Sequence, residues 1–156
     1  MADDSKINLY NSQDFLIDDR IAHVIKDVTH IMVRSLQKKL NDYDVPFSHW
    51  AILRILWKQD GMSQRELSTK AGVMEPTTAN IVQQMEVKGH ITRQYLGSNK
   101  RKRHVFLTKQ GKHLEHQLVP LAEDVNKIAT RGISKKELKL LRSTMIKMIK
   151  NLDDKS

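Results

Sequence analysis

A basic cluster lies between Lys88 and Lys112, where eight Lys or Arg side chains occur with no acid among them. These eight charges nearly equal the formal net charge of +9 of the whole chain. They belong to Lys88, Arg93, Lys100, Arg101, Lys102, Arg103, Lys109 and Lys112. Lys and Arg neutralise phosphates and release counterions from nucleic acid, so the cluster favours an anionic partner. The charge alone does not separate DNA from RNA or from a membrane surface.

Residues 76–84, just before this cluster, carry hydroxyl and amide side chains and no charge. Such side chains suit contacts with base edges, because amides pair with adenine and Thr methyl groups meet thymine methyl groups. A polar surface without a binding role is the alternative. Together the two segments predict a contact with double-stranded DNA. The predicted DNA-binding residues are Gln64, Pro76, Thr77, Thr78, Asn80, Gln84, Arg93, Asn99, Lys100, Arg101, Lys102 and Arg103.

The elements that would position these residues form a helix-turn-helix. Ser63 and Glu66 have the spacing of a capping box, in which each side chain accepts from the other residue's backbone amide. The box predicts a short helix that ends before Gly72, a residue suited to a left-handed turn. Pro76 is favoured in the first turn of a helix and predicts a second helix over residues 76–88. Two helices joined by a short turn containing glycine are typical of the helix-turn-helix.

A β-hairpin is predicted directly after these two helices. Residues 90–96 and 104–108 have the composition of short strands, and they flank the sequence GSNKRKR. The Gly, Ser and Asn residues suit a turn. A KRKR run alone is weak evidence for nucleic-acid binding, but after a candidate recognition helix it indicates the wing of a winged helix-turn-helix. The predicted fold class is therefore mainly α with a small β-hairpin wing.

Long amphipathic helices are predicted on both sides of the DNA-binding lobe at residues 47–108. Apolar residues recur at helical spacing over residues 14–42 and again over residues 109–152. A capping box at Ser134 predicts the start of the last helix. Because a small domain has little use for such helices by themselves, we expect 14–42 and 109–152 to be dimerisation helices. The sequence thus predicts one domain over residues 1–156 and a homodimer.

Composition and motifs argue against several other classes of protein. The chain has no Cys, which excludes thiolate zinc sites and Cys nucleophiles. Acids stand where a secretory signal would be basic, and no apolar run approaches the ~20 residues of a membrane span, so we expect a soluble, cytoplasmic protein. His113, Glu115 and His116 fall short of a closed zinc site, and whether they bind a regulatory metal stays open. With no HExxH, phosphate-loop or nucleophile motif, we expect no enzyme, no required cofactor and no metal site.

Three motifs together carry a family resemblance. They are SHWAILRIL at residues 48–56, SQRELSTKAGVMEPTTANIVQQMEVKGHITRQ at 63–94, and HVFLTKQG at 104–111. With the flanking helices, they resemble the MarR-type transcriptional regulators, which are dimeric winged helix-turn-helix proteins, and within them the SlyA-like branch. The resemblance covers residues 14–152. It implies a sequence-specific, ligand-responsive repressor that binds a palindromic operator as a homodimer.

The same resemblance assigns roles to particular residues. The family typically has an Asp-Arg-Arg run at the wing tip, and here Asn99, Lys100 and Arg101 correspond to it. Arg101 would enter the minor groove, with an amide in place of the orienting carboxylate. Asn80 stands where close relatives often carry arginine, so an adenine-compatible contact would replace a guanine contact. The alternative function is a nonspecific architectural DNA-binding protein, or an antirepressor that acts by competition.

The resemblance also implies a small, aromatic and anionic effector bound between the dimerisation helices and the DNA-binding lobe. The candidates for binding it are His30, Arg34, His49 and Trp50, which could supply an aromatic floor and groups able to meet a carboxylate. Each of the four could instead be packed or solvated. The sequence does not identify the effector, the operator or the controlled genes, and it does not separate repression from activation.

Overall fold

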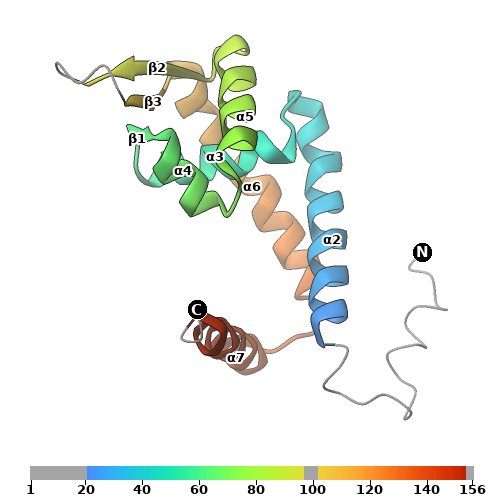
Figure 1. Cartoon of the computed structure of the whole chain (residues 1–156). Helices are drawn as coiled ribbons and strands as arrows, with labels where there is room; N and C mark the ends of the chain where they lie inside the picture. Colours follow the sequence, from blue (N-terminus) through green and yellow to red (C-terminus); the bar gives the residue numbers. More distant parts are fainter. Residues whose placement is uncertain (1–20, 97–101, 154–156) are drawn as a thin grey trace. The chain divides into compact units, whose positions relative to one another are not determined.

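The computed structural model describes residues 21–96 and 102–153 (Figure 1). Over these residues the chain is mainly α-helical with one three-stranded antiparallel sheet, which confirms the predicted fold class. The chain divides into two compact units, Met1–Phe47 and Ser48–Ser156. The single domain over residues 1–156 stays a prediction.

The first unit contains helix α2 (Ile21–Leu40), followed by a 3-10 turn, η2 (Asn41–Tyr43). The helix predicted over residues 14–42 is confirmed from residue 21 to residue 40, and residues 14–20 lie outside the described residues. The side chain of Gln37 holds the last residue of the first unit, since its Oε1 accepts from the amide of Phe47 at 2.6 Å. Four apolar side chains of α2 are at least 39% exposed, namely Ile21, Val24, Val28 and Ile31.

Helix α3 (Phe47–Lys58) contributes a large part of the core of the second unit. Its side chains of Trp50, Ile52, Leu53 and Leu56 are all buried. The rings of Trp50 and Trp57 meet edge to face, with centroids 5.5 Å apart, an arrangement that aromatic pairs favour. Trp50 is buried and Trp57 is half-buried, so both rings pack in the second unit.

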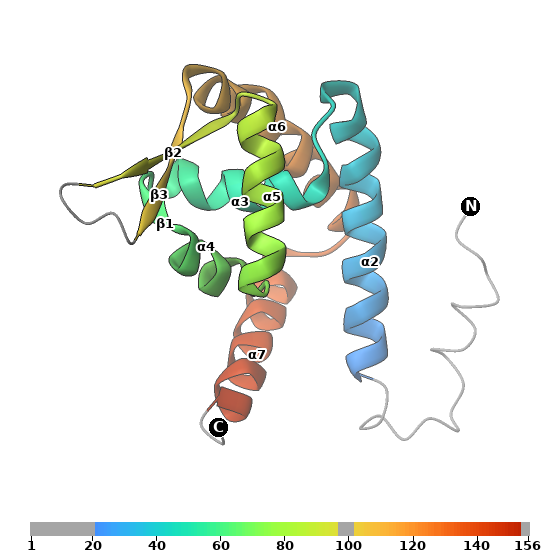
Figure 2. The ribbon, with the colours of Figure 1, turned by 45° about the horizontal axis from the view of Figure 1, so that its top comes forward.

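The helix-turn-helix consists of α4 (Gln64–Ala71) and α5 (Glu75–Val87), as Figure 2 shows. The predicted capping box is confirmed, since the Ser63 hydroxyl accepts from the amide of Glu66 at 3.3 Å and the Glu66 carboxylate accepts from the amide of Ser63 at 2.8 Å. Gly72 has a φ of 64°, the left-handed conformation that lets the chain leave α4. The second helix begins at Glu75, one residue before the predicted start at Pro76.

The sheet has the strand order β1-β3-β2. Strands β2 (Ile91–Tyr95) and β3 (Arg103–Leu107) form the predicted hairpin, which projects away from the helices (Figure 1). Strand β1 (Met62–Ser63) was not predicted, and it pairs with β3 so that Met62 lies opposite Val105. The sheet therefore connects the start of α4 directly to the wing.

Helix α6 (Lys109–Ala129) begins at the base of the wing. Thr108 caps it, with its Oγ1 accepting from the amide of Gly111 at 3.0 Å and donating to the carbonyl of Gly89 at 2.6 Å. Gly111 is required here, because a Cβ atom would collide with the backbone carbonyl oxygen of His90. The carbonyl of Gly111 also accepts from the indole Nε1 of Trp57 at 2.9 Å.

Helix α7 (Lys135–Asp153) follows the second capping box, in which the Ser134 amide donates to the Glu137 carboxylate at 2.8 Å. The predicted start of this helix is confirmed. None of its residues is buried in the single chain. Five of its apolar side chains are at least 46% exposed, namely Leu140, Leu141, Ile146, Ile149 and Leu152.

Candidate nucleic-acid interface

Helix α5 presents a polar surface to solvent. The exposed residues among those predicted on it are Pro76, Thr77, Asn80 and Gln84. Thr78 is an exception, because it is 0% exposed and its Oγ1 donates to the carbonyl of Met74 at 3.2 Å. Thr78 lies four residues before Val82, so both side chains occupy the face of the helix that is turned to the core. The prediction that Thr78 contacts DNA is corrected accordingly.

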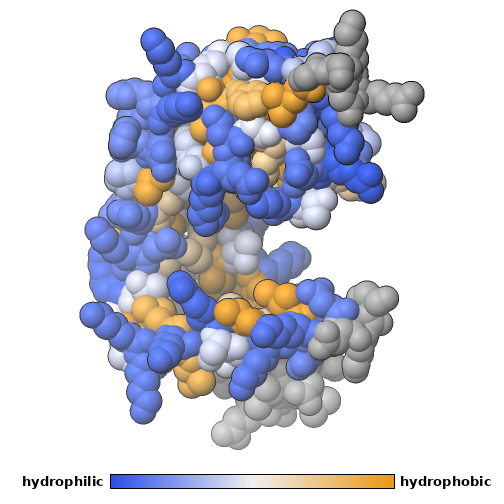
Figure 3. Space-filling model, turned by 90° about the vertical axis from the view of Figure 1, so that its left-hand side faces the viewer, coloured by the Kyte–Doolittle hydropathy of each residue, from blue (hydrophilic) through white to orange (hydrophobic). Residues whose placement is uncertain are grey.

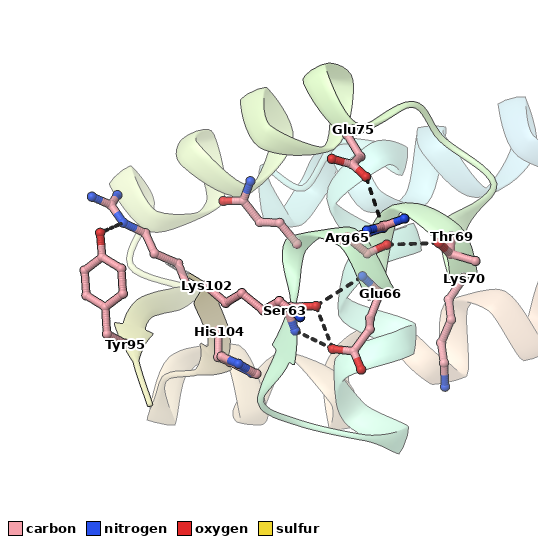
Figure 4. Close-up of a pocket in the computed structure, with 11 residues that line it drawn as sticks. Ser63, Arg65, Glu66, Thr69, Lys70, Glu75, Tyr95, Lys102 and His104 are labelled. Atoms are coloured by element: carbon pink, nitrogen blue, oxygen red, sulfur yellow. Dashed lines mark hydrogen bonds and ion pairs between the residues drawn. The ribbon is translucent and has the colours of Figure 1, made fainter. Parts of the chain in front are cut away.

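A pocket of about 790 Å³, here called the wing pocket, lies between α4 and the hairpin (Figure 4). It brings together three of the predicted residues, Gln64, Lys102 and Arg103. The other lining residues are Ser63, Arg65, Glu66, Thr69, Lys70, Glu75, Tyr95 and His104. Four cations and two acids thus surround the pocket, which leaves it with a positive balance.

The two acids of the wing pocket are each held by a partner. The carboxylate of Glu75 lies 3.7 Å from the guanidinium of Arg65. Glu66 is held by the capping box, and the hydrogen bond from the side chain of Ser63 is the main cause that lowers its pKa. Glu66 therefore stays ionised near neutral pH, and its carboxylate is hydrogen-bonded to Ser63 at the start of α4. Lys70, Lys102 and Arg103 are the cations whose charge no carboxylate of the pocket pairs with, and Lys70 donates to the amide oxygen of Gln59 at 3.2 Å.

The wing carries an ordered arginine at its stem. Arg103 lies opposite Tyr95 in the β2–β3 register, and its Nε donates to the Tyr95 hydroxyl at 2.9 Å. This hydrogen bond is the main cause that raises the pKa of Arg103, so the guanidinium stays charged. Lys102 and Arg103 are both exposed. Asn99, Lys100 and Arg101 lie outside the described residues, so their predicted contacts stay predictions.

Arg93 differs from the other predicted cations. Its Nε and Nη2 donate to Oε2 of Glu86 at 2.9 and 2.6 Å, and its amide donates to Oε1 at 3.1 Å. The hydrogen bond from the Arg93 side chain is the main cause that lowers the pKa of Glu86. Lys112 likewise lies 3.8 Å from the carboxylate of Asp60. Arg93 and Lys112 are therefore each paired with an acid outside the basic cluster, and the ion pair with Glu86 at the base of the wing argues against the predicted contact of Arg93 with DNA.

Sequence reasoning assigned no binding role to eight of the residues that line the wing pocket, among them Arg65, Lys70, Tyr95 and His104. Arg65 and Lys70 could have been found, since they follow the predicted cap on a short helix. Tyr95 and His104 depend on the strand register, which places them beside Arg103 and Ser63. The Nδ1 of His104 lies 2.8 Å from the carbonyl oxygen of Gly61, so Nδ1 is the protonated, donating nitrogen.

The four candidate effector residues fall into two pairs. His30 and Arg34 lie on α2, where Arg34 Nη2 is 2.9 Å from His30 Nε2. His49 and Trp50 lie on α3 and are 0% and 3% exposed. The Nε2 atom of His49 is 3.3 Å from Oε1 of Gln84 on α5. The effector site stays a prediction.

Metal sites and membrane-spanning helices are both absent from the part of the chain that the structure describes. No group of three His, Asp or Glu residues there could hold a metal ion. His113, Glu115 and His116 are exposed on α6. No helix among the described residues is long and apolar enough to cross a membrane.

In sequence, the chain is similar to known transcriptional regulators. Residues 47–102 match the family model of the MarR family. The HTH-type transcriptional regulator TtmR of Methylorubrum extorquens (strain PA1) is 21% identical over 102 residues, which are 65% of this chain and 52% of that protein. The chain therefore spans about half the length of this curated relative.

Solved structures show the same fold. A MarR transcriptional regulator from Methanosarcina mazei Go1 aligns with a TM-score of 0.80 and 24% identity, over 89% of this chain and 94% of that chain. MepR of S. aureus, solved as a DNA complex, gives 0.78 and 20%, over 84% and 97%. BpsR of Bordetella bronchiseptica, whose DNA binding is regulated by 6-hydroxynicotinic acid, gives 0.76 and 18%, over 83% and 98%.

Proposed function

From the MarR-family match and the exposed polar surface of α5, we propose that this chain is a sequence-specific regulator of transcription that binds double-stranded DNA. The match supports a MarR-family winged-helix protein, and the SlyA-like branch stays a prediction. The observation that carries the proposal is that Thr77, Asn80 and Gln84 are exposed on one helix of a helix-turn-helix. MepR, which shares the fold, is known in complex with DNA.

The two parts of the interface would contribute different terms to binding. Recognition helices of this motif enter the major groove, where Thr77, Asn80 and Gln84 would contact base edges. Lys70 and Lys102 of the wing pocket would contact phosphates, and each phosphate contact steepens the salt dependence of log K by about 0.9. Affinity would come mainly from the second group and sequence preference from the first.

The proposal includes a homodimer. Helices α2 and α7 carry large apolar side chains that are exposed in the single chain, such as Ile31 at 60% and Ile149 at 57%. Figure 3 shows apolar side chains exposed among hydrophilic ones on the face that it presents. Contiguous exposed apolar surface marks an interaction site. A two-fold dimer would place two recognition helices on half-sites about 10 bp apart, so the operator would be a palindrome.

The proposal also includes regulation by a small anionic ligand, which makes the protein a ligand-responsive repressor in the cytoplasm. BpsR provides a parallel among proteins of the same fold, since its DNA binding responds to 6-hydroxynicotinic acid. His30 and Arg34 are exposed and offer a cation to a carboxylate. A ligand would act only through a higher affinity for the conformation that does not bind DNA.

The test is selection of bound sequences from random duplex DNA by the purified protein. The proposal expects an enriched palindrome with half-sites one helical turn apart, and binding to it at fixed salt that exceeds binding to random DNA by at least about 10³-fold. Asn80→Ala should relax the preference at one base pair. Equal affinity for selected and random DNA would replace the proposal with a nonspecific architectural protein.

A further inference from the structure

His49 links the core of the second unit to the recognition helix. Its side chain is 0% exposed on α3, and its Nε2 atom lies 3.3 Å from Oε1 of Gln84 on α5. Gln84 is exposed on the same helix as Thr77 and Asn80. One end of the Gln84 amide therefore contacts a buried ring while the residue itself faces solvent.

The chemistry of the two groups fixes how this contact is made. An amide oxygen only accepts hydrogen bonds, so Nε2 of His49 carries the proton and donates. The oxygen of Gln84 is thus held toward the protein interior. The NH2 group leaves the same carbon atom in a different direction and supplies two donors at the surface.

This arrangement changes which base Gln84 can read. Pairing of a Gln amide with adenine needs the oxygen to accept from N6 and the nitrogen to donate to N7. Because the oxygen of Gln84 is directed toward the buried ring of His49, the end of the amide that remains for a base edge is the NH2 group, which donates. Guanine offers two neighbouring acceptors in the major groove, N7 and O6, and so matches this pair of donors.

We propose that His49 is a positioning residue. By holding the oxygen of the Gln84 amide, it leaves the NH2 group to contact the base and so directs Gln84 to guanine in place of adenine. The inference rests on the proposed function, because it requires α5 to enter the major groove. It goes further by naming the base and the residue behind the choice. The expectation that the amides of α5 read adenine then applies to Asn80 and not to Gln84.

The test uses the purified protein and duplexes of its selected operator that carry each of the four bases at the position read by Gln84. That position is the one where Gln84→Ala removes the base preference. The unmodified protein should prefer guanine over adenine by roughly tenfold, which is the scale of one bidentate contact. His49→Met should abolish or invert this preference, since Met has no donor. Gln has nearly the same shape as His and keeps a donor, so His49→Gln should retain the guanine preference.

A second variant tests the same contact from the other side. Gln84→Glu leaves His49 in place and presents acceptors only, so the preferred base at that position should change from guanine to cytosine, whose N4 donates. Circular dichroism establishes that each variant is folded. Guanine preference that survives in both His49→Met and Gln84→Glu would overturn the inference. A protein without any base preference would overturn the proposed function instead.

Discussion

Replacing Glu86 by Gln should destabilise the protein measurably, because Glu86 is the partner of a half-buried arginine. Three hydrogen bonds of 2.6–3.1 Å join its carboxylate to Arg93, whose side chain is 20% exposed. Gln keeps the shape and one possible hydrogen bond but removes the charge. Arg93 would then keep a charge that no carboxylate neutralises.

The size of the effect follows from the exposure of the pair. Net contributions of hydrogen bonds to charged groups are about 1.5–3 kcal/mol, and those of exposed ion pairs are about 0.2–1 kcal/mol. The side chain of Glu86 is 36% exposed, which places the pair between these limits. We expect Glu86→Gln to lower the free energy of unfolding by about 1–2 kcal/mol, or the melting temperature by roughly 3–6 °C for a chain of this size.

A matched control exists in the same lobe. The ion pair of Glu75 with Arg65 is longer, at 3.7 Å, and its side chains are 65% and 85% exposed. Glu75→Gln should therefore change stability by less than about 0.5 kcal/mol. Both variants would be unfolded in denaturant at one salt and one protomer concentration, because the proposed dimer would make stability depend on concentration.

The pH dependence of the free energy of unfolding provides an independent check on the ion pair of Glu86 with Arg93. The pKa of Glu86 is lowered in the folded state by Arg93, so its contribution to stability is present above the unfolded pKa of about 4.3 and is lost as pH falls through the folded value. The difference in stability between the unmodified protein and Glu86→Gln should shrink between neutral pH and pH values below about 4. Equal effects of Glu86→Gln and Glu75→Gln at neutral pH would refute the reasoning.

Three further predictions concern other parts of the lobe. Because its charge is already compensated, Arg93→Gln should leave the slope of log K for DNA against log salt nearly unchanged, whereas Lys102→Gln should reduce it by about 0.9; a filter-binding salt titration measures both. Gly111→Ala should lower the free energy of unfolding by about 1–3 kcal/mol or more, because its Cβ would collide with a backbone carbonyl; thermal unfolding would show this. Thr78→Val should leave base preference intact while Thr77→Val alters it, as selection from random DNA would show, since only Thr77 is exposed.

The parts of the fold that sequence predicted correctly depend on neighbours in the chain. Both capping boxes and the turn at Gly72 involve residues at most four apart, so their chemistry is visible in the sequence. Strand β1 was missed because two residues carry no periodic pattern and their partner is 41–43 residues away in β3. Ser63 was assigned to the cap alone, although it serves the cap and the strand together.

The candidate site was predicted less completely than the fold. The sequence did not show which face of α5 is exposed, and it did not show which residues far apart in the chain contact one another. Thr77 and Thr78 have the same chemistry, and only the orientation of α5 decides that one is exposed and the other buried. Glu86 lies just before the basic cluster, so a count of acids inside the cluster missed the partner of Arg93. The contact of His49 with Gln84 spans 35 positions and could be found only from the packed structure.

The junction at the base of the wing joins α6 to both strands of the hairpin. Thr108 bonds to the carbonyl of Gly89, Gly111 packs against His90 without room for a methyl group, and Trp57 bonds to the carbonyl of Gly111. The first turn of α6 therefore cannot rotate or slide without moving the roots of both hairpin strands. Amides of this junction should consequently exchange with solvent at a single, slow rate that reports on the whole lobe.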